Sequence, residues 1–202
     1  ITFGNFVVLL ALLSGFIFVG PLLAIAFYDI SFQLQQGRKP TLGHSMREIW
    51  RHIGNEMMFA VILLIIFLVW ARAASLTHVF FPMQAQPDLG ELATFLALGS
   101  VVGSLFATFV FCISAFSLPM IVDRKADMVT AVVTSFNAVL RNKPAMLVWA
   151  LLIVAAVAVG IGTAFIGLGI TLPLIGHATW HAYRETIDSS AWPRHPDYIG
   201  KP

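Results

Sequence analysis

Charge is scarce in this chain of 202 residues. Only 11% of the residues are Asp, Glu, Lys or Arg, 58% are hydrophobic, and the mean hydropathy is +0.86. A soluble domain carries roughly 25% charged residues, so the composition indicates an integral membrane protein in a lipid bilayer. Twelve basic residues stand against ten acidic ones, which is too even a balance for the basic surface that binds nucleic acid. Nucleic acid is therefore excluded as a partner.

Cysteine and the common catalytic motifs are also nearly absent. The single Cys112 excludes an internal disulfide and any multi-cysteine zinc or iron-sulfur site. The sequence has no phosphate-binding glycine loop ending in Lys and Ser or Thr, no HExxH and no GxSxG. The most compact charged cluster comprises Asp123, Arg124, Lys125 and Asp127, which a solvated helix start explains better than a catalytic pair. We therefore expect no enzyme and no cofactor.

Long apolar runs are what the sequence does contain. Four of them reach the roughly 20 residues that a helix needs to cross a bilayer, at 3–28, 57–80, 92–122 and 145–176. Pro21, Pro119 and Pro173 mark places where the first, third and fourth run would kink or break. The predicted fold is all-α, a polytopic bundle of transmembrane helices with four spans.

Two further segments are amphipathic. Residues 41–53 place Met46, Ile49 and Trp50 on one helical stripe, and residues 127–141 place Val129, Val133 and Phe136 likewise. Both segments are expected to lie in the membrane interface. At an offset of 87 residues their apolar positions coincide, which indicates an internal repeat of span, surface helix and span. Chance similarity between two amphipathic helices is the alternative.

The repeat defines the expected organisation. A single membrane domain comprises one unit at 1–80, a second at 92–187 and an extended tail at 188–202. Eight of the twelve basic residues lie in loops 29–56 and 123–144. The positive-inside rule makes these loops cytoplasmic, and four spans then put the C-terminus on the other side, in a bacterial periplasm.

Ionisable side chains are missing from the centres of the four predicted spans. Proton pumps and ion-coupled transporters need such groups inside the membrane, so the sequence argues against ion coupling. It does not argue against a path for an uncharged solute, which backbone and hydroxyl groups can line.

Small residues recur in the third and fourth spans. Gly99 and Gly103 form a GxxxG pair, and Gly160, Ala164 and Gly167 share one helical face. Such patterns let helices approach closely. Packing within the chain explains them, and a docking face for another subunit is the alternative.

His177 and His181 raise the question of a metal or haem, because they lie four residues apart on a helix. A metal site needs three or four protein ligands, and the central spans offer no further histidine. Trp180, Tyr183 and Arg184 in the same two turns, like Trp50 elsewhere, are typical of side chains that anchor a helix at the membrane surface. The anchoring interpretation is favoured over cofactor binding.

Three segments carry a resemblance to a known family. They are GPLLAIAFYDISFQLQQG at 20–37, SLPMIVDRKADMVTAVVTSFNAVLRNKPAMLVWALL at 117–152 and LPLIGHATWHAYR at 172–184. With them the chain resembles, over nearly its whole length, the bacterial membrane family called domain of unknown function 2189. Its members carry a further surface helix and span upstream, which implies a fragment and five spans in the complete protein. The family has no established activity.

Some members are labelled as cytochrome c oxidase proteins. The chain lacks the set of intramembrane histidines that would hold haem and copper, so that label would fit only an accessory partner. The expected function is a non-catalytic subunit that packs against other membrane subunits, plausibly in a respiratory or other energy-transducing complex. The alternatives are a channel or transporter for an uncharged solute, and a protein that organises lipids through its surface helices.

Overall fold

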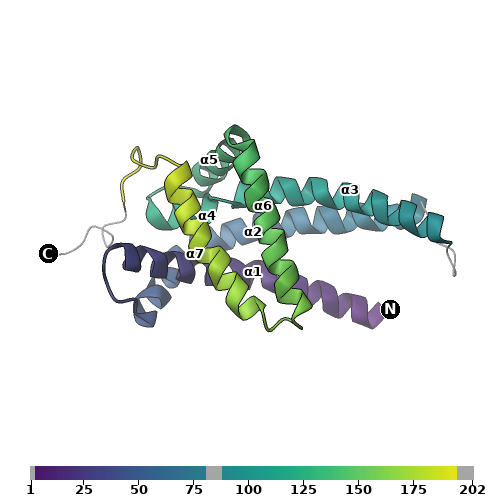
Figure 1. Cartoon of the computed structure of the whole chain (residues 1–202), viewed down its shortest axis with the longest axis horizontal. Coiled ribbons are helices and arrows are strands. Elements are labelled where there is room, and N and C mark those ends of the chain that lie inside the picture. Colours follow the sequence, from purple (N-terminus) through teal and green to yellow (C-terminus); the bar gives the residue numbers. More distant parts are fainter. Residues whose placement is uncertain (1–2, 81–87, 195–202) are drawn as a thin grey trace. The chain divides into compact units, whose positions relative to one another are not determined.

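The computed structural model describes residues 3–80 and 88–194. In that part of the chain the backbone forms seven helices (Figure 1): α1 Phe3–Gln35, α2 Leu42–Phe80, α3 Leu89–Ser114, α4 Ser117–Asp123, α5 Met128–Arg141, α6 Lys143–Gly162 and α7 Leu168–Thr186. Four stretches are long and apolar enough to cross a membrane: Gly15–Gln35, Ile53–Leu76, Leu89–Asp123 and Lys143–Gly162. The predicted all-α bundle of membrane-spanning helices is confirmed.

Two compact units divide the chain. The first combines Ile1–Ala60 with Cys112–Pro202, and the second is Val61–Phe111. The second unit is a hairpin of the later part of α2 and most of α3. In this hairpin Gly103 lies opposite Trp70, whose indole nitrogen would be 3.8 Å from an added Cβ at the glycine.

The third span breaks where its proline predicts. α3 ends at Ser114 and α4 begins at Ser117, so that Pro119 lies in the first turn of α4, where its missing N–H leaves no hydrogen bond unmade. Ser135 of α5 forms hydrogen bonds with the backbone on both sides of the break. Its hydroxyl donates to the carbonyl of Cys112 at 2.8 Å and accepts the amide N–H of Phe116 at 3.1 Å. α5 is thereby fixed against the junction of α3 and α4.

The expected fourth span at 145–176 is wrong as a single helix. α6 ends at Gly162, residues 163–167 turn back, and α7 returns against α6 (Figure 1). The turn requires positive φ at Ala164 (53°) and Phe165 (67°), and Thr163 closes it by accepting the N–H of Gly167 at 2.9 Å. A Cβ on Gly167 would lie 3.1 Å from the Cα of Gly160, so the return depends on two glycines.

α7 packs beside α1 with both helices running in the same direction. His177 contacts Ser31 and His181 contacts Gln35, and the separation is 146 residues in both pairs. Gly176 permits this approach, because a Cβ there would lie 2.8 Å from the Cβ of Phe27. The end of α7 therefore lies beside the end of α1.

The return of α7 bears on the predicted topology. Loops 29–56 and 123–144 are expected on one side of the membrane and the C-terminus on the other. In the structure the amide of Lys125 donates to the carbonyl of Pro193 at 2.9 Å, and His181 contacts Gln35. The described segment after α7 therefore lies beside the start of the second loop, and its side of the membrane stays a prediction.

The amphipathic segments differ from each other. The first continues into the following span without a break, as α2, whereas α5 ends at Arg141 and α6 begins at Lys143. In both, apolar side chains such as Met46, Trp50 and Val129 are exposed, while small or polar ones are buried. The apolar stripes therefore face outward, as they would toward lipid. Interfacial placement and duplication stay predictions.

Substitution at Gly176 tests the packing of α7 on α1. Gly176→Ala should lower the free energy of unfolding by about 1–3 kcal/mol, because the added methyl group overlaps Phe27. Gly169→Ala is the control, since nothing lies within 4 Å of its added Cβ. Equilibrium unfolding in detergent micelles measures both, and equal stability of the two variants would contradict the close approach.

Cysteine labelling tests the topology. In a Cys112→Ala background, Lys39→Cys and Ser190→Cys should react with a membrane-impermeant maleimide from the same side of sealed vesicles. Ile166→Cys, in the exposed turn between α6 and α7, should react from the opposite side. Labelling of Ser190→Cys together with Ile166→Cys would show that α7 does not return.

Candidate functional site

A buried carboxylate, Asp123, organises the polar end of the first unit. It is the last residue of α4 and is fully buried. Tyr183 of α7 donates its hydroxyl to Asp123 Oδ2 at 3.0 Å. Three guanidinium groups surround the same carboxylate, with nitrogen–oxygen distances of 2.9 Å for Arg124, 3.4 Å for Arg184 and 3.7 Å for Arg194. Four side chains from α7 and the flanking segments thus converge on one acid.

The balance of charge at this cluster is positive. One carboxylate faces three guanidinium groups, whose side chains are 12% (Arg124), 34% (Arg184) and 30% (Arg194) exposed. Burial, and then the adjacent Asp123, raise the pKa of Tyr183, so the phenol keeps the proton that it donates. A buried acid needs such partners, because an unpaired charge in the interior is very costly.

The segment after α7 is part of this cluster. Arg124 donates to the carbonyl of Trp192 at 2.9 Å, and the backbones of Arg124 and Arg194 form an antiparallel bridge. Ser189 is buried, and its hydroxyl lies 3.4 Å from Asp123 Oδ2. The described part of the expected extended tail, residues 188–194, is therefore folded back onto α4.

The predicted helix start at the charged cluster is half right. Asp127 is exposed and caps α5 by accepting the N–H of Thr130, and hydrogen bonds from Thr130 lower the pKa of Asp127. Asp123 is not solvated, however. The expectation failed for it because its partners Tyr183, Arg184 and Arg194 lie 60 or more residues away in the sequence, where spacing gives no signal.

Two of the predicted surface anchors are core residues. Trp180 and Tyr183 are fully buried. Trp180 stacks against Tyr28 at 6.3 Å between ring centroids and meets Phe32 edge-on at 6.0 Å. The correction follows from the return of α7 onto α1, which covers these rings with protein. Trp50 is exposed, as an anchor requires, and Arg184 is engaged with Asp123.

A second polar cluster joins the end of α1 to the start of α2. Asp29, fully buried, accepts hydrogen bonds from Gln33 and Ser45, both at 2.7 Å, and from His44 Nδ1 at 3.1 Å. Gln33 also accepts the amide N–H of Thr41 at 3.2 Å. The cluster closes the connection between the two helices. Sequence reasoning missed it because Asp29 directly follows an apolar run.

Two more acids are buried on the inward stripe of α2. Glu48 pairs with Arg51, one turn further along, at 2.9 Å. Glu56 is fully buried within the span Ile53–Leu76, and neither of its oxygens has a hydrogen-bond partner among the described residues. Ser45, Glu48 and Glu56 recur at helical spacing, which was the available signal for an inward polar stripe.

Hydrogen bonds tie the two helical histidines to α1. Ser31 Oγ lies 2.9 Å from the carbonyl oxygen of Phe27 and 2.6 Å from His177 Nδ1. The hydroxyl has one proton, which either of these two atoms can accept. The contact joins the middle of α7 to the end of α1.

Gln35 holds His181 in the same way. The indole N–H of Trp180 donates to Gln35 Oε1 at 3.1 Å, which leaves the amide group of Gln35 to donate to His181 Nδ1 at 3.3 Å. In its neutral form His181 thus carries its proton on Nε2.

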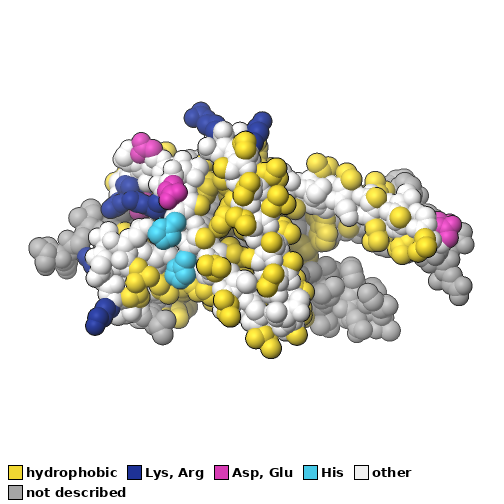
Figure 2. All heavy atoms as spheres, viewed as in Figure 1, with side chains coloured by type: hydrophobic (Ala, Val, Ile, Leu, Met, Phe, Trp, Pro, Cys, Tyr) yellow, Lys and Arg dark blue, Asp and Glu magenta, His cyan; other side chains and the backbone are white. Residues whose placement is uncertain are grey.

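Within the described residues, no group of three or more His, Cys, Asp or Glu side chains is placed to hold a metal ion. Figure 2 shows histidine side chains at the surface, close to basic and acidic ones, beside a broad hydrophobic area over α6 and the first part of α7. The arrangement fits a polar contact surface at the end of a membrane-embedded helix.

The small residues are divided between two roles. Gly160 is buried, and an added Cβ would clash with Leu168, so it serves the packing of α6 on α7 together with Gly167. Ala164 lies in the turn between these helices. Gly99 is exposed and has open space around it. Of the candidate docking residues, Gly99 and Ala164 are exposed, and Gly99 is the one that lies within a helix.

Replacement of Asp123 tests the central cluster. Asp123→Asn should cost about 3–5 kcal/mol of unfolding free energy, because three cations lose their buried counter-charge. Glu185→Gln, a nearby exposed acid, should change stability by no more than about 0.5 kcal/mol. Denaturant titration in micelles compares them, and a stable Asp123→Asn protein would rule out the dependence on this carboxylate.

Comparison with known proteins gives one family. The sequence model of a family described as "Predicted integral membrane protein (DUF2189)" matches residues 8–123. The resemblance is thereby confirmed for those residues, which include the segment at 20–37, whereas most of the segment at 117–152 and all of LPLIGHATWHAYR lie beyond them. No curated protein and no solved structure matches the chain. Because the match covers more than half of its residues, the chain belongs to the DUF2189 family of predicted integral membrane proteins.

Proposed function

We propose that this chain is a non-catalytic subunit that packs against a larger membrane assembly. The observation that carries the proposal is the exposed cation Arg72 on the apolar hairpin Val61–Phe111. Large apolar side chains are exposed along both of its helices, among them Ile65, Leu68, Val101 and Leu105. Lipid covers such side chains equally well, so apolarity alone does not favour a partner.

Two local features favour a protein partner. Gly99 is exposed with open space beside it, which would allow the backbone of a second helix to approach closely. Arg72 is exposed within the apolar span Ile53–Leu76, and no described residue is seen to pair with it. A cation on a lipid-facing span is costly unless it is paired or reaches the surface.

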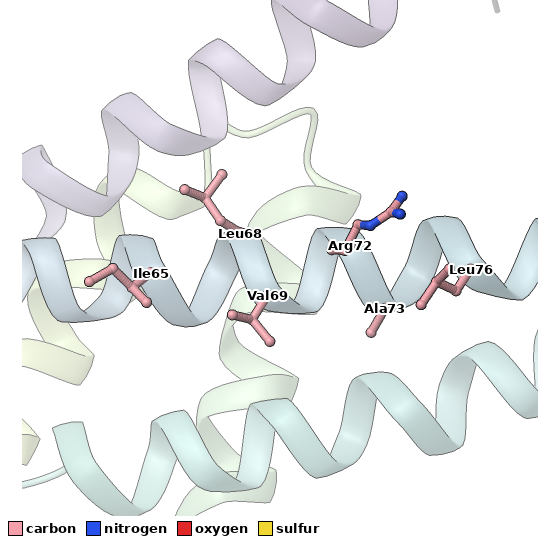
Figure 3. A pocket seen from close by; sticks show the side chains of 6 residues that line it. All are labelled: Ile65, Leu68, Val69, Arg72, Ala73 and Leu76. Atoms are coloured by element: carbon pink, nitrogen blue, oxygen red, sulfur yellow. The ribbon is translucent and has the colours of Figure 1, made fainter.

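Figure 3 shows Arg72 on α2 with its apolar neighbours Leu68, Val69 and Ala73. Arg72 and Leu68 extend from the side of α2 turned away from α3 in this view. We infer that a partner helix covers this face and brings an acidic side chain to Arg72. A second, separate contact would form at Gly99 on α3.

A non-enzymatic role is part of the proposal. The polar groups around Asp123 and Asp29 are engaged with one another across α1, α2, α4 and α7. Such mutual engagement supports a structural use of these side chains rather than catalysis. The choice of a respiratory or other energy-transducing complex as the assembly rests only on the cytochrome c oxidase label that the family resemblance implies.

The orientation that we propose places the polar end of the first unit in the bacterial cytoplasm. Loops 29–56 and 123–144 contain eight of the twelve basic residues, and the return of α7 adds Arg184 and Arg194 to the same side. Ten basic residues on one side strengthen the positive-inside argument for the inner membrane.

Gentle extraction of native membranes tests the function. After size separation, the chain should co-migrate with a large complex identified by mass spectrometry. Gly99→Leu should lower the co-migrating fraction about tenfold, which corresponds to about 1.4 kcal/mol of lost contact energy. Gly162→Leu, which also has open space but lies in the first unit, is the control. Migration of the wild-type chain as a small oligomer would refute the proposal.

A further inference from the structure

A groove runs between α1 and α7 within the first unit. It has a volume of about 340 Å³ and an almost entirely apolar lining, to which α1 contributes Leu23 and Phe27 and α7 contributes Gly169, Leu172 and Pro173. Leu23 is half exposed, and no atom lies within 4 Å of a Cβ built on Gly169. The groove is therefore open to the hydrocarbon around the helices.

The polarity of α7 changes along the helical face that begins in this groove. Pro173, His177, His181 and Arg184 follow one another at intervals of four, four and three residues, which places them on one face of the helix. Phe27 links the two parts, because it lines the groove and its ring centroid lies 5.8 Å from that of His177. The surface thus passes from apolar through polar to cationic.

The cationic end can receive an anion. Arg184 and Arg194 both lie at the single carboxylate of Asp123, and their side chains are 34% and 30% exposed. Two guanidinium groups are thus partly open to the surface beside one buried acid. His181 is exposed, and in its neutral form the ring has its N–H on Nε2, away from the nitrogen that Gln35 occupies. These donors suit a phosphate group.

We propose that this surface binds one anionic phospholipid. An acyl chain lies in the groove between α1 and α7, and the phosphate contacts His181 and Arg184. The dimensions agree, because the groove residue Pro173 and His181 are eight residues or about 12 Å apart along α7, which is within the roughly 15 Å of hydrocarbon that one leaflet contributes. A zwitterionic lipid would fill the groove equally well but would bring no net negative charge to the arginines.

Native mass spectrometry of the full chain in detergent tests this site. The probes are palmitoyl-oleoyl phosphatidylglycerol and palmitoyl-oleoyl phosphatidylcholine at equal concentrations. The wild-type protein should retain one phosphatidylglycerol in preference to phosphatidylcholine. Arg184→Gln should lower its occupancy about tenfold, as expected for the loss of one charged hydrogen bond, and should leave phosphatidylcholine unchanged. Arg141→Gln, an exposed cation on α5, should leave both unchanged.

A second variant tests the groove without touching the arginine cluster. Gly169→Leu should fill the open space and reduce the retention of both lipids, whereas Gly162→Leu, outside the groove, should not. Equal retention of the two lipids by the wild-type chain would overturn the headgroup site. Unchanged retention in Gly169→Leu would overturn the acyl site, even if Arg184→Gln failed to fold.

Discussion

The pairing of Asp123 with three arginines and a tyrosine is the interaction on which the polar end of the first unit depends. A fully buried carboxylate remains ionised only where cations and hydrogen-bond donors replace water. Here the donors come from α7 and from the segments after α4 and α7. The acid therefore fixes the relative position of these parts of the chain. Hydrophobic packing alone would not fix it, because apolar side chains are about as stable against lipid as against protein.

Hydropathy and proline positions predicted the spans, because both act over short stretches of chain. They located three membrane-crossing helices to within several residues, apart from the later start of the first, and the break before Pro119. They did not reveal the turn at residues 163–167, whose sequence is as apolar as the helices that it joins. That turn depends on backbone conformation and on the close approach of Gly160 and Gly167, which no local pattern records.

The same limit explains the polar sites. His177, His181 and Arg184 were recognised from their spacing, but the burial of Trp180 and Tyr183 follows from α7 lying on α1, a contact between distant segments. Asp29 and Glu56 stand at the ends of apolar runs, where a charged residue ordinarily signals the membrane surface. Their burial depends on contacts with the neighbouring helices, which the sequence pattern does not show.

The packing of α7 on α1 also determines when during synthesis this contact can form. The paired residues Ser31 and His177, like Gln35 and His181, are separated by 146 residues. At a synthesis rate of about 5–20 residues per second, the ribosome adds the second partner roughly 7–30 s after the first. During that interval the packing face of α1 is without its final neighbour, so lipid or another chain occupies it and must leave when α7 arrives. The contact between α1 and α7 is therefore among the last that synthesis allows to form.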